Sequence, residues 1–317
     1  MRFRVDPWSV EYGASVETEL AVSTVDVNVD VELPADRWHP IGPSVTAREP
    51  ATVLFVDGVR RVDARVWIEG PDGDAQPGIC ASFGAGVARC GPGLRAEVIH
   101  PTVGRGVFSA SAHAAEIVTV HGAYTAHVAG GPNPEALWLA LQERMARREV
   151  EAAEAARREC PEADAALVVV DGPLTGRQHV AGAIGVIKTH GVAYLPPELH
   201  RMVGELAPGA RTPLFTIGGG WSRHSWYLRL PGGADAPWAG VVRVECSSEV
   251  PVPDAGGLAE TVGVTLSRFA SEPYKDPRAP QNLYPIGGLE RELRRRLGDA
   301  RLMFRALRRA AASPAVG

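Results

Sequence analysis

Uninterrupted apolar runs predict two central strands of a sheet. The segments VLFVDG (53–58) and LVVVDG (167–172) each place four apolar residues before an Asp-Gly pair. A strand buried on both faces has this pattern, whereas a half-buried strand alternates apolar and polar residues. We therefore expect two buried strands, the first from Thr52 to Val56, that end at Asp57 and Asp171.

Shorter patterns add further strands and an irregular beginning. Val62 to Ile68 alternates and predicts a strand that returns after Asp57-Gly58, and residues 78–90 predict a third strand of an antiparallel meander. Short strands are also expected at 212–219, 225–230 and 240–246. Residues 1–50 are expected to form an N-terminal arm with some alternation, in which one strand face carries Val25, Val27, Val29 and Val31.

Helical spacing of apolar residues predicts long helices between and after the strands. The first is expected from Pro134 to Cys160, with Asn133 as its N-cap and Pro134 at the first helical position. Its apolar stripe consists of Leu137, Leu141, Met145, Ala152 and Ala156. Other helices are expected at 257–270 and 288–311, and residues 176–191 read as a helix or helix–strand segment. Together these elements predict an α/β fold.

The chain has 317 residues, of which 45% are hydrophobic and 22% charged, and this composition is typical of a folded protein. No linker interrupts the elements, so we expect one domain at 51–317 preceded by the extension at 1–50. The net charge of −4 and pI near 6.2 argue mildly against a surface coated with DNA-binding charge, although a local basic stripe is compatible with them. The basic residues are nearly all arginines; the lysines are Lys188 and Lys275.

Cysteine spacing and hydropathy indicate the compartment that we expect. The four cysteines form no CxxC or His/Cys cluster, which argues against a zinc site: Cys80, Cys90, Cys160 and Cys246. The first residues show no apolar signal segment, and no run approaches the ~20 apolar residues of a membrane span. We therefore expect a cytoplasmic protein with reduced thiols that does not enter a membrane.

The two Asp-Gly pairs are the candidate chemistry. If their strands are neighbours, Asp57 and Asp171 lie together at one edge of the sheet, and their like charges favour a cation between them. Oxygen ligands of this type suit Mg²⁺ or Mn²⁺, which can support phosphodiester hydrolysis. A third carboxylate from the preceding helix would complete the set. Asp-Gly is also a common turn signal, so either pair could simply begin a turn.

The order of six short motifs over residues 50–310 resembles the NurA family of nucleases. The matching segments are FVDGVRR (55–61), REVE (148–151), LVVVDGPL (167–174), IGVIKTH (184–190), the strand pair WYLRL and VVRVEC (226–230, 241–246), and PRAPQNLYPIGGLE (277–290). The resemblance implies a ribonuclease-H-like mixed sheet flanked by helices, and a Mn²⁺- or Mg²⁺-dependent nuclease that processes DNA ends for repair. It also implies a homodimer and a hexameric HerA-like ATPase as partner.

The same resemblance assigns residues to roles. Asp57, Asp171 and the helix residue Glu151 correspond to the metal carboxylates, while Glu149 and Glu154 remain alternatives to Glu151. Lys188 would hold the scissile phosphate as a point charge. Tyr284 corresponds to the tyrosine of the family's Tyr-Pro motif near the active site.

One departure from the family leaves another function open. The histidine that some members carry after the Tyr-Pro motif has no counterpart in GGLERELRRRLGD, where Glu290 or Glu292 is the alternative to it, although neither is assigned to the site. A catalytically inactive subunit that binds DNA or docks a translocase is therefore an alternative. An actin-like phosphotransferase is a weaker one, because the chain has no matching nucleotide-binding glycine loop late in its sequence.

Overall fold

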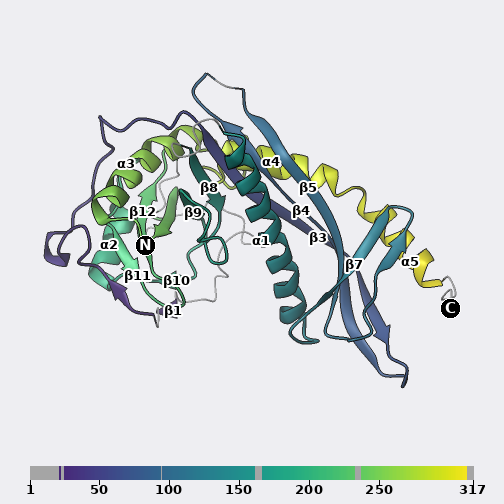
Figure 1. Ribbon diagram of the computed structural model, residues 1–317. Helices are drawn as coiled ribbons and strands as arrows, with labels where there is room; N and C mark the ends of the chain where they lie inside the picture. Colours follow the sequence, from purple (N-terminus) through teal and green to yellow (C-terminus); the bar gives the residue numbers. More distant parts are fainter. Residues whose placement is uncertain (1–20, 23–24, 94, 161–165, 233–236, 313–317) are drawn as a thin grey trace, which may run out of the picture. The chain divides into compact units, whose positions relative to one another are not determined.

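The computed structural model describes residues 21–22, 25–93, 95–160, 166–232 and 237–312, which form an α/β fold with a large mixed sheet flanked by helices (Figure 1). The strand order in this sheet is β2-β11-β12-β13-β9-β8-β3-β4-β5-β7-β6. Its strands are β2 (Val27–Asn28), β3 (Val53–Glu69), β4 (Ala75–Cys90), β5 (Glu97–Ser109), β6 (Ile117–Thr119), β7 (Gly122–Val128), β8 (Leu167–Asp171), β9 (Ala183–Ile187), β11 (Phe215–Ile217), β12 (Arg223–Arg229) and β13 (Val241–Ser247). The remaining elements are α1 (Pro134–Arg158), α2 (Pro197–Glu205), α3 (Val252–Phe269), α4 (Tyr284–Arg296), α5 (Ala300–Ala312), a 3-10 turn (Ala35–Arg37) and the pair β1 (Ala21–Val22) and β10 (Val192–Ala193).

Packing divides the described residues into two compact units. Unit 1 contains those up to Phe55, together with 89–96 and 160–287, and unit 2 contains 56–88, 97–159 and 288–312. The divisions fall inside β3, β4 and α4, which are continuous elements. No linker in the sequence could therefore mark them.

Unit 1 contains the strands that the sequence predicted best. The expected strand in ALVVVDGPL is β8, which is buried up to its last residue, and the three late strands are β11, β12 and β13. β8 and β9 are parallel, while β9, β13 and β12 pair antiparallel, so the sheet is mixed. In residues 176–191, expected to be a helix or helix–strand segment, 176–182 are turns and a bend and 183–187 are the strand β9.

The N-terminal residues are less regular than expected. The valines alternate with exposed polar residues as predicted, and Val27 and Val29 pack against the core of unit 1, but Val25 is exposed and the strand has only two residues. Most of residues 1–24 lie outside the described residues.

A histidine in the core of unit 1 makes stability depend on pH. The ring of His190 lies 5.8 Å from that of Tyr227 and 5.1 Å from that of Trp238, and one ring nitrogen is 3.1 Å from the Val241 carbonyl oxygen. Burial lowers the pKa of His190 to about 4, although the bond to Val241 opposes this shift. Because an unfolded histidine titrates near ~6.5, the unfolded chain binds the proton first as the pH falls.

We expect the free energy of unfolding to fall by about 2–3 kcal/mol from this residue as the pH drops from ~6.5 to about 4. His190→Gln keeps an N–H that can donate to Val241 but cannot titrate, so its stability should depend less on pH across this window. Urea denaturation at pH 7 and pH 4.5 measures the difference. Equal pH dependence in the two proteins would contradict the shift.

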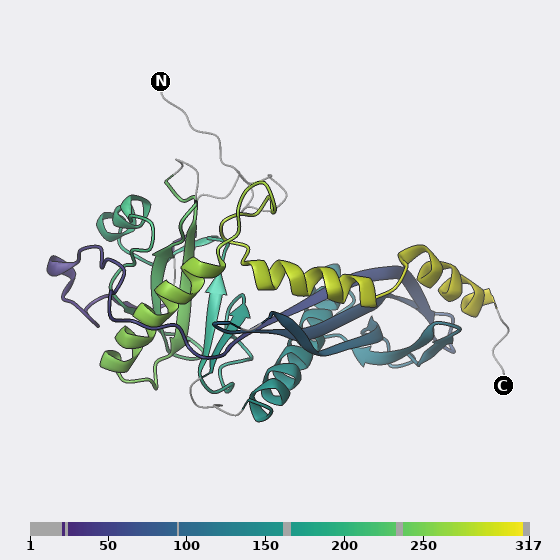
Figure 2. The same cartoon turned by 90° about the horizontal axis from the view of Figure 1, so that it is seen from above.

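The strands of unit 2 differ from the predicted antiparallel meander. The sequence was expected to turn at Asp57-Gly58, but β3 continues through this pair to Glu69, so the predicted first strand and returning strand are one strand. The predicted third strand is the larger part of β4. The long helix is confirmed as α1, with the Asn133 side chain accepting a hydrogen bond from the Ala136 N–H. In unit 2, α1 and the end of α4 lie against opposite faces of the strands (Figure 2).

The predicted C-terminal helix is two helices. Gly298 adopts a φ of 80°, and the Asp299 carboxylate accepts hydrogen bonds from the N–H groups of Arg301 and Leu302. A glycine in the left-handed region ends α4, and the aspartate caps the start of α5. Apolar residues recur at helical spacing on both sides of Gly298, which explains why the sequence predicted one helix.

Two further expectations concern cysteines and membranes. All four cysteines are free and buried, and burial raises the pKa of the Cys80 thiol to about 12. Among the residues that the structure describes, the helices are too short or too polar to cross a membrane.

Candidate metal centre

Asp171 lies where a buried strand ends. β8 is buried from Leu167 to Val170, and Asp171, its last residue, is partly exposed. Gly172 then takes a φ of 109°, and its N–H donates to the Val186 carbonyl of the neighbouring strand. Glycine adopts this backbone conformation without the steric cost that a side chain would add. The Asp-Gly pair therefore ends this strand as expected and leaves the carboxylate at the edge of the sheet.

Lys188 contacts that carboxylate directly. Its Nζ donates to Asp171 Oδ2 at 2.7 Å and to Asn282 Oδ1 at 2.9 Å. The Asn282 amide in turn donates to Asp276 Oδ2 at 2.6 Å. Lys188 follows β9 directly, so parallel pairing with β8 explains how residues 17 positions apart meet. The sequence singled out Lys188, but it gave no signal for Asn282 or Asp276.

Asp57 is on β3, whose first residues pair with β8. The Leu167 N–H donates to the Thr52 carbonyl at 3.1 Å, which joins the starts of the two apolar runs. Because this bond joins the two strands where both begin, they can continue to pair only if they run in the same direction. The two apolar runs therefore lie side by side and lead toward Asp57 and Asp171. The Asp57 side chain is buried, with 8% of the residue exposed.

The helix residue beside β3 is Glu149. This residue is 2% exposed, and its Oε1 lies so close to Gly58 that a Cβ there would be 2.5 Å from it. Gly58 therefore makes room for the carboxylate, which explains a glycine within a continuous strand. Arg60 feels the charges of both Glu149 and Asp57: burial lowers the pKa of its guanidinium, and these two carboxylates partly offset that effect.

Three carboxylates could hold a metal ion: Asp57, Asp171 and Glu290. One oxygen of each lies within 4.8 Å of those of the other two; Asp57 is buried, and the others are partly exposed. Glu290 is on α4, and the sequence named it but did not assign it to the site. These residues form the one such group among the residues that the structure describes, and they will be called the carboxylate group.

The composition of this group suits a hard divalent cation. Lys188 at Asp171 and Arg294, 4.0 Å from Glu290, offset only part of the charge of the three carboxylates. Like charges this close are stabilised by a cation, and oxygen ligands favour Mg²⁺, Mn²⁺ or Ca²⁺ over softer metals. The donor set therefore fits a divalent ion, and it does not by itself select one.

The sequence favoured Glu151 and Tyr284, of which Glu151 lies outside the carboxylate group. Glu151 is exposed on α1 and is not in the carboxylate group, and the alternative Glu154 is also exposed and lies 3.9 Å from Arg158. Tyr284, the first residue of α4, is 36% exposed, and its ring centre is 5.0 Å from Lys275 Nζ. Glu290 replaces Glu151 as the third metal-binding candidate, and the role of Tyr284 stays a prediction.

A buried ion pair supports the loop that follows Asp171. Glu245 Oε1 accepts a hydrogen bond from the Leu174 N–H at 2.7 Å, and its Oε2 accepts one from Arg243 at 2.7 Å. Arg223 Nε lies 3.2 Å from the same Oε2 without hydrogen-bond geometry. The contact with Leu174 shows that the pair also fixes the chain three residues after Asp171.

Comparison with known proteins identifies no family for this chain. No protein-family model matches the chain, and no curated protein matches it significantly.

Proposed function

We propose that this chain is a metal-dependent deoxyribonuclease with a ribonuclease-H-like core. The observation that carries the proposal is the carboxylate group beside Lys188, with two of its members on paired strands. A mixed sheet whose neighbouring strands present carboxylates at one edge supports the fold assignment. The motif order shared with NurA nucleases supports DNA as the substrate.

The residues of the proposed site have different roles. Asp57, Asp171 and Glu290 would hold Mn²⁺ or Mg²⁺, which when bound supplies an activated water and stabilises charge on the scissile phosphate. Lys188 is held by Asp171 and Asn282, so its ammonium is fixed where it can attract a phosphate oxygen. Arg60 balances the charge of Glu149 and Asp57, so that the buried carboxylates are not left without a positive neighbour.

Exposed arginines offer phosphate contacts outside this site. In α4 and α5 the arginine side of the two helices is exposed: Arg291, Arg294, Arg295, Arg296, Arg301, Arg305, Arg308 and Arg309. A basic stripe of this kind can follow a DNA backbone even though the net charge is −4. On the family resemblance we also propose a homodimer that works with a HerA-like ATPase.

A cleavage assay on end-labelled linear DNA tests the proposal. Single-stranded and duplex substrates are incubated with Mn²⁺, Mg²⁺ or EDTA, with and without the HerA-like ATPase of the same genome. We expect degradation with Mn²⁺ or Mg²⁺ and none with EDTA, because the carboxylate group needs a cation to act on a phosphodiester. If no DNA is cut with either metal, with or without the ATPase, the protein is not a nuclease.

A further inference from the structure

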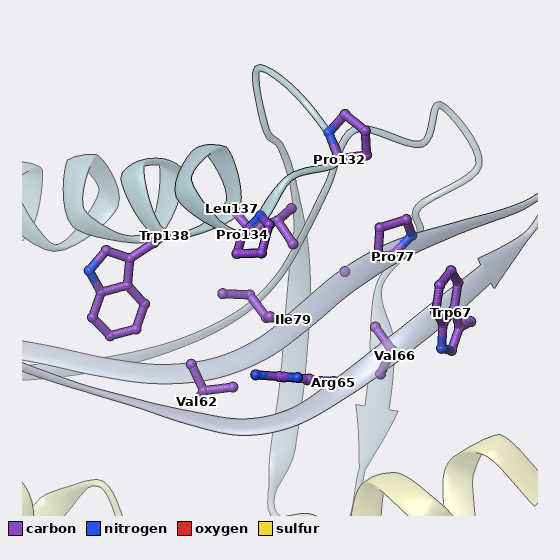
Figure 3. Close-up of a pocket in the computed structure, with 11 residues that line it drawn as sticks. Val62, Arg65, Val66, Trp67, Pro77, Ile79, Pro132, Pro134, Leu137 and Trp138 are labelled. Atoms are coloured by element: carbon purple, nitrogen blue, oxygen red, sulfur yellow. The ribbon is translucent and has the colours of Figure 1, made fainter.

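An apolar pocket lies in unit 2 between the β3–β4 pair and the start of α1. Its volume is about 430 Å³, within the size range of small-ligand sites. Figure 3 shows Trp138 at one end and Trp67 at the other, with Val62 and Ile79 between them. The rim above is formed by the prolines Pro77, Pro132 and Pro134. We call this the tryptophan pocket.

The two tryptophans are exposed to an unusual degree for residues of their size. Trp67 is 71% exposed and Trp138 40%. The guanidinium of Arg60 lies 4.6 Å from the ring centre of Trp138, in a cation–π contact. Large aromatic faces left open to solvent beside arginines are the composition of platforms on which unpaired bases stack.

Charge also favours a nucleic acid as occupant. Of the described residues that line the tryptophan pocket, Arg65 is the charged one and none is a carboxylate. Arg60, over the ring of Trp138, already faces the charges of Asp57 and Glu149. An anionic strand would therefore find apolar surface for its bases and a guanidinium group for a phosphate.

The pocket is connected to the candidate site by one side chain and one strand. Arg60 contacts Trp138 and interacts electrostatically with Asp57 and Glu149. Arg60 is three residues from Asp57 on β3, which corresponds to about 10 Å of extended strand. The tryptophan pocket and Asp57 therefore share β3, with the pocket on the α1 side of this strand and Glu290, on α4, on the other side.

We propose that the tryptophan pocket binds unpaired bases of single-stranded DNA, one stacked on Trp67 and another on Trp138, with Arg65 contacting an adjoining phosphate. The proposal rests on the proposed nuclease function for the identity of the nucleic acid. It adds a preference for single-stranded ends, since bases inside a duplex are already stacked on each other and cannot enter the pocket.

Binding without cleavage tests the proposal. The probe is a fluorescein-labelled 15-nucleotide oligothymidylate in EDTA, and anisotropy gives the Kd of the full-length protein. Trp67→Ala and Trp138→Ala should each raise Kd about tenfold, as expected when one stacking surface is lost. Trp67→Phe should recover most of the affinity, and a strand of the same length with abasic positions should bind wild type as weakly as the alanine variants bind the oligothymidylate.

Controls separate this proposal from its alternatives. Leu139→Ala removes an apolar side chain of the same helix that is 55% exposed and does not line the pocket, and it should leave Kd within twofold of wild type. A blunt hairpin duplex should bind wild type and the tryptophan variants equally. Unchanged oligothymidylate affinity in both tryptophan variants would overturn the proposal, as would a change confined to self-association in sedimentation. Because EDTA stops cleavage, loss of the proposed nuclease function alone would leave the binding result intact.

Discussion

Asp57→Asn and Asp171→Asn should each lower metal-dependent DNA cleavage by roughly 10²–10⁴-fold. Asparagine keeps the shape of aspartate but removes the negative charge that balances a divalent cation. At ~1.4 kcal/mol per tenfold, this range corresponds to several kcal/mol of lost transition-state stabilisation. The rate of release of end label from linear DNA in Mn²⁺ measures the effect, and circular dichroism checks that the variants fold.

Two glutamates provide the sharpest control for this prediction. Glu290→Gln should lose activity like the aspartate variants, because Glu290 is a member of the carboxylate group. Glu151→Gln should cleave within about twofold of wild type, since Glu151 is exposed on α1. The reverse result, with Glu151 essential and Glu290 dispensable, would mean that the metal is held by the motif-derived set and not by the carboxylate group.

The glutamates Glu149 and Glu290 show why the sequence alone placed the site incompletely. The apolar stripe of α1 contains Met145 and Ala152, and Glu149 fits between them at spacings of four and three residues. This periodicity was a usable signal that Glu149 faces the sheet and that Glu151 does not. For Glu290 the signal was only its place after the Tyr-Pro motif, because its meeting with Asp57 depends on tertiary packing between elements more than 200 residues apart.

The Asp-Gly pairs show how far local turn chemistry determines the fold. At Asp171-Gly172 the prediction of a strand end is confirmed, since Gly172 takes a positive φ. At Asp57-Gly58 it is wrong, because pairing with β4 carries β3 through the pair. Identical dipeptides thus have different structures: Gly172 serves a turn, whereas Gly58 makes room for the close approach of Glu149.

Apolar patterning predicted the buried strands better than the exposed ones. β8 is buried up to its last residue and is a continuous apolar run, whereas β12 and β13 are almost wholly buried although their sequences include arginine, serine, histidine and glutamate. The strands between Glu97 and Val128 went unpredicted because they are partly exposed and rich in glycine, threonine and histidine. Such strands are specified by pairing with their neighbours more than by their own composition.

Glu245→Gln should destabilise the protein by about 3–5 kcal/mol, the cost of leaving a buried charge without its partner. Glu245 has no exposed surface and Arg243 is 6% exposed, so solvent cannot replace the lost carboxylate charge. The bond from Leu174 to Oε1 also weakens when the charge is removed. The midpoint of urea denaturation, followed by circular dichroism, measures the loss, and Glu249→Gln, an exposed change four residues away, should alter stability by less than ~0.5 kcal/mol.

A double-mutant cycle tells whether the ion pair is the cause. Arg243→Met and Glu245→Gln each break the same 2.7 Å contact, so the double variant should be less destabilised than the sum of the two single changes. Simple additivity would show that Glu245 acts through other contacts, with Leu174 as the main one. In that case the glutamate matters chiefly as an anchor for the chain after Asp171, and Glu245→Gln should weaken Mn²⁺ binding more than Arg243→Met does. If the ion pair dominates, the two single variants should weaken Mn²⁺ binding alike, because the same buried support is lost in both.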